Sequence, residues 1–303
     1  IGGGLKAGDK YLNDGTLYVA VFNEDGSGEW KALVHGQNGL DAFNSVLPFN
    51  GQDEVLVFAR AAADAAGATK MDRPEWVSVS PMTGDVYVTL TNNKYRGVRD
   101  DQPVSASNPR SYQSSGKSLG NDNGHIIRWA EAGGDHAATS FEWDIYLFGA
   151  PSDLSAENLS QLNDNNDFSS PDGLYFDPRG VLWIQTDDGA YTDTSSCMLL
   201  AALPGKVSDG SMKTTSAGQS TRVGTSASND NIKRFFVGPE GCEVTGITMA
   251  PDFKTLFINI QHPGNTWGAV AGGSIPRSAT VMITREDGDV ILAESFDTAD
   301  STT

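Results

Sequence analysis

Three acidic residues occupy matching positions in a degenerate repeat of this sequence. They are Glu75, Asp172 and Glu243, and each introduces a short apolar run, a turn containing proline, and a second run that carries an aromatic residue. Carboxylates that converge from separate copies cannot all stay ionised unless a cation offsets their repulsion. Sites rich in carboxylate oxygens suit calcium, magnesium or another hard cation. We therefore predict a metal site, the alternative being that each acid caps its own turn through local hydrogen bonds.

Further side chains with suitable donor atoms follow the second run of each copy. They are Asn92, Asn93, Asp187, Asp188, Asn259, Gln261 and His262. All offer oxygen donors except His262, which could add a nitrogen ligand.

The elements that must position these residues are strand–turn–strand units. Repeated units of this kind indicate the blades of a β-propeller, with each acid at the start of an inner strand. The acids are spaced more widely than one blade of roughly 40–50 residues. The copies therefore lie on non-adjacent blades or on blades with long insertions.

The rest of the chain also favours an all-β fold with one short helix. Residues 16–22 and 29–34 predict a hairpin around a turn, and the Ala-rich stretch 51–67 predicts a helix that Gly67 closes. Residues 96–123 and 204–231 lack a hydrophobic period, so we expect long loops or flexible lids on one face.

Composition limits the partners. The net charge of −18 argues against nucleic acid or an anionic membrane surface as a partner. No apolar run approaches the roughly 18 residues that a membrane-spanning helix needs. Two cysteines, Cys197 and Cys242, form neither a disulfide framework nor a CxxC zinc site. The chain starts at Ile1 without a signal sequence, so we expect a processed or truncated product.

The repeat motifs resemble those of the PhoX-type alkaline phosphatases over most of the chain. The similarity lies in Arg73-Pro74-Glu75-Trp76, Ser170-Pro171-Asp172-Gly173-Leu174, Cys242-Glu243-Val244-Thr245-Gly246 and the segment 121–129. The resemblance implies a six-bladed propeller that hydrolyses phosphate monoesters in a secreted or periplasmic setting, with an iron–calcium cluster at the channel mouth. It implies Glu75, Asp172 and Glu243 as cluster ligands, with Asn92, Asn93 and Asp187 as further candidates.

Two consequences follow from this resemblance. Members of the family carry upstream Cys-Glu and His-Glu-Tyr motifs that this sequence lacks in a matching context. We therefore expect residues 1–303 to be a single propeller domain, in the form of a fragment without the upstream blades. Arg73 and Arg128 are the arginines nearest the motifs, and we expect them to hold the phosphate group bidentately. The catalytic nucleophile stays unassigned.

Two other functions remain open at this stage. One is a calcium-dependent lactonase, whose propeller also collects acids and Asn around one axial cation; bound calcium without iron would favour it. The other is a non-catalytic propeller, which would present an exposed apolar patch at one mouth. For the phosphatase we expect a monomer that acts on small phosphoesters, without nucleic-acid binding or membrane insertion.

Overall fold

The computed structural model describes residues 15–113, 119–187, 196–265 and 267–292. The chain divides into two compact units. The first contains residues up to Lys70 together with Glu131–Phe141, and the second contains Met71–Ala130 and the residues from Glu142 onward. Every residue of the predicted metal site belongs to the second unit. The prediction of one propeller domain over the whole chain stays a prediction.

The first unit contains the predicted hairpin. Strand β1 (Tyr18–Phe22) pairs antiparallel with β2 (Ser27–Ala32) in an unbroken register. The ring of Phe141 contacts Phe22 and Trp30 edge-on or tilted, with centroids 5.1 and 5.4 Å away, and covers one side of the hairpin.

The predicted helix over residues 51–67 is interrupted. It forms α2 (Gln52–Val57) and α3 (Ala59–Ala65), because Phe58 between them has a non-helical ψ of 39°. Gly67 ends α3 as predicted, with a φ of +79°. Its N–H donates to the carbonyl of Asp64 at 3.1 Å, which is one of the two bonds of a Schellman cap.

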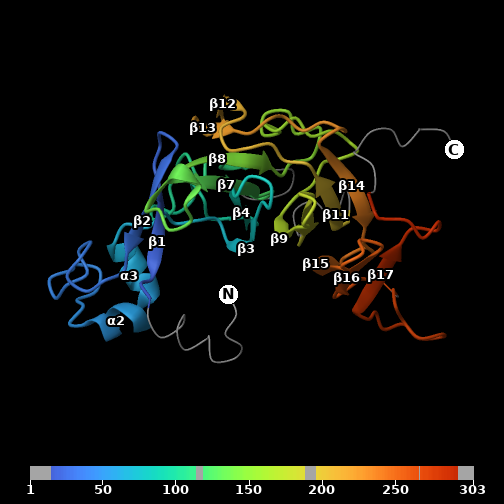
Figure 1. Cartoon of the computed structure of the whole chain (residues 1–303), viewed down its shortest axis with the longest axis horizontal. Coiled ribbons are helices and arrows are strands. Elements are labelled where there is room, and N and C mark those ends of the chain that lie inside the picture. Colours follow the sequence, from blue (N-terminus) through green and yellow to red (C-terminus); the bar gives the residue numbers. More distant parts are fainter. Residues whose placement is uncertain (1–14, 114–118, 188–195, 266, 293–303) are drawn as a thin grey trace. The chain divides into compact units, whose positions relative to one another are not determined.

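The second unit is built from antiparallel sheets whose strands follow one another in chain order (Figure 1). One sheet runs from β3 through β4 and β7 to β8, a second through β9, β10, β11 and β14, and a third through β15, β16 and β17. The strands are β3 (Pro74–Val79), β4 (Val86–Leu90), β7 (His125–Glu131), β8 (Ser140–Phe148), β9 (Pro171–Phe176), β10 (Leu182–Thr186), β11 (Met198–Ala202), β14 (Ile232–Val237), β15 (Glu243–Met249), β16 (Thr255–Gln261) and β17 (Ala279–Thr284).

The middle sheet is buried on both faces. All five residues of β10 are buried, and successive side chains of a strand point to opposite faces. Leu182 and Ile184 join a cluster that includes Tyr87 of β4, whereas Trp183 joins a cluster that includes Val244 of β15. The second sheet is therefore packed between the first and the third, as blades pack around a propeller axis.

These sheets confirm the all-β class, and they are blades of a β-propeller. The first strand of the second sheet, β9, contacts both β3 and β15. The three acid-bearing copies therefore lie on neighbouring blades, and the wide spacing comes from long insertions. Among the described residues, no helix combines the length and apolar character needed to cross a membrane.

The prediction of loops over residues 96–123 and 204–231 is only partly right. The second stretch contains a hairpin of β12 (Ser211–Thr214) and β13 (Ser220–Val223), and β13 bridges to β8. The first stretch contains the short pair β5 (Tyr112–Gln113) and β6 (Leu119–Gly120). Its polar side chains are partly internal, because Arg96 and Arg110 are buried and hydrogen-bonded.

Candidate metal centre

The three predicted acids stand at equivalent places in three neighbouring blades. Glu75 is the second residue of β3, Asp172 the second of β9, and Glu243 the first of β15. Because β9 contacts β3 and β15, the starts of all three first strands face one region. Asp172, in the middle, is 8 % exposed.

The backbone turns in the same way just before each acid. Arg73, Ser170 and Gly241 each lie two positions upstream of an acid, and their φ angles are +51°, +50° and +72°. Only glycine adopts this left-handed region without strain, and for other residues it costs on the order of 1 kcal/mol. Two of the three blades therefore tolerate strain to keep this turn, which indicates that the direction of the following acid matters.

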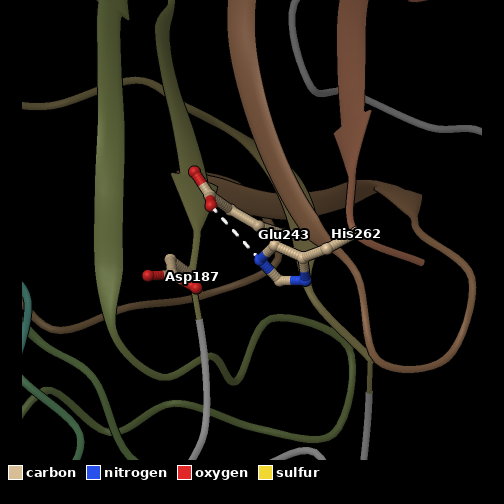
Figure 2. A group of neighbouring side chains, drawn as sticks. All are labelled: Asp187, Glu243 and His262. Carbon is tan, nitrogen blue, oxygen red and sulfur yellow. Dashed lines mark ion pairs between the residues drawn. The ribbon is translucent and has the colours of Figure 1, made fainter. Parts of the chain in front are cut away.

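Asp187 and Glu243 meet His262 at the ends of three strands (Figure 2). Asp187 follows β10, His262 follows β16, and Glu243 begins β15. One donor atom from each of the three lies within 4.8 Å of the others. The Nε2 atom of His262 is 3.6 Å from Oε2 of Glu243. Two oxygen donors and one nitrogen donor therefore converge at this point.

His262 is oriented by Ser278, just before β17, and by Gly241, two residues before β15. Its main-chain N–H donates to Oγ of Ser278 at 3.1 Å, and its Nδ1 lies 3.2 Å from the carbonyl oxygen of Gly241. A carbonyl can only accept, so Nδ1 carries the proton in this bond. When the ring is neutral, this bond leaves the lone pair on Nε2, the atom that faces Glu243. In that form Nε2 can bind a metal ion.

The carboxylates influence one another electrostatically. Burial, and then the negative charges of Glu75, Glu243 and Asp187, raise the pKa of Asp172 to about 7. Burial and Asp187 also raise the pKa of Glu243, against the opposing effects of Thr245 and His262. Four acids therefore lie within electrostatic reach of one another, and the charge they share favours a bound cation.

A buried amide, Gln185, lies near the end of β10, two residues before Asp187. Gln185 is fully buried, and neither polar atom of its side chain has a hydrogen-bond partner in the described part of the chain. The side chain lies against Gly173, where an added Cβ would be 2.3 Å from its Oε1. Buried amides are almost always satisfied, so this amide and the carboxylates together suit a site that holds more than protein atoms.

The sequence of the chain matches the family model described as alkaline phosphatase PhoX over residues 3–264. The chain belongs to the PhoX alkaline phosphatase family. The resemblance found in the blade motifs is thereby confirmed, and none of the curated protein sequences matches this chain.

A solved PhoX structure is also similar to this chain. It is Pseudomonas fluorescens PhoX in complex with vanadate, a transition state analogue, and it has 40 % sequence identity and a TM-score of 0.77. The match covers 94 % of this chain and 47 % of the Pseudomonas chain. This PhoX family member therefore spans about half the length of that relative.

The other predicted ligands bond to neighbouring side chains in this PhoX chain. Asn92 accepts from Nη1 of Arg73 at 2.9 Å and donates to Oγ of Ser170 at 3.3 Å, so it joins the two blade starts. Asn259 accepts from Oγ1 of Thr280 at 2.8 Å, whereas Asp188 lies outside the described residues.

Asn93 has hydrogen-bond partners away from the three acids. Its amide nitrogen donates to Asp72 at 2.8 Å and to Gln102 at 2.9 Å, and its oxygen accepts from the N–H of Tyr95 at 2.9 Å. Asp72 is buried and also pairs with Arg96 at 2.8 Å. Asn93 thus belongs to a network that anchors the segment before Arg73, which the neighbouring Asn-Asn pair in the sequence did not reveal.

The two predicted phosphate-binding arginines differ in the exposure of their side chains. Arg73 is exposed near Asp172, where its charge partly opposes the rise in the pKa of that carboxyl, and its Nη2 is 4.0 Å from Glu75. Arg128, by contrast, has a fully buried side chain. It forms two bonds to Asp144, at 2.7 and 3.0 Å, and a third to Asp209 at 2.7 Å.

Cys242 is a buried residue beside a site acid, as predicted. It belongs to the apolar cluster around Trp183 and Val244, and burial raises the pKa of its thiol to about 11. A thiol in this state is a poor metal ligand, because the thiolate is the form that binds metal.

Proposed function

We propose that this PhoX family member hydrolyses phosphate monoesters at the centre formed by Glu75, Asp172, Asp187, Glu243 and His262. The observation that carries the proposal is the convergence of these donors from three blades. It is supported by the 40 % identity to a PhoX structure determined with vanadate, a transition state analogue. A site that holds such an analogue is complementary to a reacting phosphoryl group.

We further propose that the centre holds calcium together with iron. Carboxylate oxygens are the preferred donors for calcium, and a set of carboxylates with one imidazole also suits iron. Glu75, Asp172, Asp187 and Glu243 would supply the oxygens and His262 the nitrogen. When bound, such ions supply positive charge to the phosphoryl oxygens and lower the pKa of a coordinated water.

Arg73 is the residue of the chain best suited to bind the phosphate directly. Its guanidinium is exposed beside Asp172, and Asn92 and Glu75 hold it in place. Arginine recognises phosphate oxygens through two parallel hydrogen bonds, which fixes the orientation of the group. Arg73 would therefore orient the substrate and add positive charge at a centre dominated by carboxylates.

We propose small, soluble phosphoesters as substrates and a secreted or periplasmic location, with the protein acting as a monomer. The net charge of −18 supports a soluble partner and disfavours polyanionic ones.

The test combines elemental analysis with turnover of p-nitrophenyl phosphate. Glu243→Gln and Asp172→Asn should each lower the bound metal and the activity together, because each removes a charged ligand. Glu29→Gln, which changes an exposed acid of β2 in the first unit, is the matched control and should change neither. Metal content is measured on this chain, and turnover both on this chain and on a version extended upstream.

Two results would count against the proposal. Turnover that survives both site substitutions would remove these acids from the reaction. Bound calcium without iron, together with hydrolysis of a lactone in place of a phosphoester, would support the lactonase alternative.

A further inference from the structure

The first unit contains a pocket that shares no residue with the metal centre. Its volume is about 340 Å³, which is enough for a small organic molecule. The lining comes from the hairpin of β1 and β2 and from the segment Glu131–Phe141, and both belong to the first unit. The pocket is therefore a feature of one compact unit.

Two aromatic side chains form one wall of this pocket. Trp30 of β2 pairs with Ala20, and Tyr18 lies two residues before Ala20 on β1, so both rings are on the same face of the hairpin. The ring of Phe141 packs against Trp30 with centroids 5.4 Å apart. The main-chain N–H of Trp30 also donates to the carbonyl of Thr139 at 2.9 Å. The indole is therefore held in place without a ligand.

The charged part of the lining is a buried carboxylate. The side chain of Glu131 is 6 % exposed, and its Oε2 lies 3.1 Å from Nδ1 of His136. When the ring of His136 is neutral, Nδ1 donates to the carboxylate, which keeps its negative charge. The lining contains neither Lys nor Arg among the residues that the structure describes. The pocket thus combines aromatic faces with one negative charge.

The segment that carries Glu131 and His136 has a fixed shape. Gly133 and Gly134 have φ angles of +69° and +70°, in the left-handed region that favours glycine. Asp135 then accepts twice, from the N–H of Ala137 at 2.9 Å through its side chain and from that of Ala138 at 2.8 Å through its carbonyl. These two alanines line the pocket and present only methyl groups to it.

We propose that this pocket binds a small, soluble organic cation of the quaternary ammonium class. The face of an aromatic ring attracts a cation, and Trp does so most strongly. A primary ammonium carries three N–H donors that need acceptors, whereas this lining offers methyl groups and a carboxylate that is already bonded to His136. A quaternary ammonium has no N–H donor, so its burial here leaves no donor unsatisfied. The proposal is independent of the phosphatase activity.

The test measures the affinity of the chain for choline by isothermal titration calorimetry. The matched ligand is 3,3-dimethylbutan-1-ol, which has the same shape but a neutral carbon in place of the charged nitrogen. We expect it to bind at least about tenfold more weakly, because cation–π attraction requires the charge. Ethanolamine, the corresponding primary amine, should also bind more weakly than choline, because its N–H donors lack acceptors in the pocket.

Three substitutions test the residues of the pocket. Trp30→Leu and Tyr18→Leu remove the aromatic faces and Glu131→Gln removes the charge, and each should weaken choline binding at least about fivefold. Glu29→Gln is the matched control, because Glu29 is exposed on β2 beside Trp30 but points to the other face of the hairpin. The thermal unfolding temperature shows whether each variant stays folded. Because Tyr18 is 42 % exposed, Tyr18→Leu tests the pocket even if Glu131→Gln does not fold.

Several outcomes would overturn the proposal. They are absence of choline binding, equal affinities for choline and its neutral analogue, tighter binding of ethanolamine, and choline binding that Trp30→Leu and Tyr18→Leu leave unchanged. A last arm of the experiment uses vesicles of phosphatidylcholine. Binding to the vesicles without binding of free choline would assign the pocket to a lipid headgroup and would overturn the assignment to a soluble cation.

Discussion

The hydroxyl of Thr89 donates to the main-chain oxygen of Asp172 at 2.6 Å and accepts from the N–H of Trp76 at 3.0 Å. Thr89 is fully buried on β4, whereas Trp76 lies on β3 and Asp172 on β9. One hydroxyl therefore connects the first strands of two neighbouring blades next to their acids. Thr91, two residues further along the chain, makes a similar contact. Its hydroxyl donates to the carbonyl of Pro171 at 3.0 Å.

Thr89→Val keeps the shape of the side chain and removes this link. The carbonyl of Asp172 and the amide of Trp76 then lose a partner, so we expect unfolding free energy to fall by about 1–3 kcal/mol. Metal affinity should fall as well, because the backbone of Asp172 is no longer linked to the strand that carries Glu75. Thr89→Ser keeps the hydroxyl and is the control. Urea unfolding and metal titration of both variants measure the effect, and a Thr89→Val protein equal to the unchanged one would contradict it.

His262→Ala should reduce bound iron more than bound calcium. Calcium takes oxygen ligands almost exclusively, whereas imidazole nitrogen suits iron. We expect iron affinity to fall at least about tenfold and calcium content to change little. Elemental analysis after dialysis provides the measurement. His136→Ala removes an exposed histidine from the first unit and should leave both metals unchanged. Equal loss of the two metals in the His262 variant would exclude it as a selective iron ligand.

The stability of the metal-free protein should fall as pH rises from about 4 to above 7. The pKa of Asp172 is about 7 in the folded protein and 3.8 in its ordinary state, so the folded state binds more protons in this interval. Its contribution is complete below pH 4 and is lost as pH rises through 7. Urea unfolding in EDTA across this range measures the trend, and Asp172→Asn should flatten it. Added calcium should restore stability most strongly above pH 7, where Asp172 is ionised.

Arg128→Met should destabilise the fold without affecting phosphate binding. The substitution leaves Asp144 buried without its partner, and breaking such a pair costs about 3–5 kcal/mol. Arg73→Met is the comparison: it should raise KM for p-nitrophenyl phosphate and change unfolding free energy by no more than about 0.5 kcal/mol. Urea unfolding and steady-state kinetics on the folded protein separate the two roles. A raised KM with unchanged stability in the Arg128 variant would reverse the assignment.

The acids of the centre were accessible from the sequence because their positions are local features of a repeat. Glu75, Asp172 and Glu243 each start a strand, and blade geometry brings equivalent starts together without further information. His262 and Asp187 follow from the same logic, since each comes directly after the second strand of a copy. Gln185 was missed because an amide within a buried strand carries no signal of its own.

The sequence did not reveal several contacts of predicted site residues or one local break in a helix. Arg128 pairs with Asp209, 81 residues later, on a segment that lacks any hydrophobic period. The amides of Asn92 and Asn93 are adjacent in the sequence, yet one joins the centre and the other a buried network around Asp72. The break of the helix at Phe58 also has no counterpart in the Ala-rich composition, which favours helix throughout.

Among the described residues, the candidate donors come from three sheets: Glu75 from the first, Asp172 and Asp187 from the second, and Glu243 and His262 from the third. Ion binding at the proposed centre would therefore be coupled to correct docking of the blades. Chelation would then loosen the packing between blades while leaving the hydrogen bonds inside each blade largely intact. Occupancy of the proposed centre would then measure how completely the blades are docked on one another.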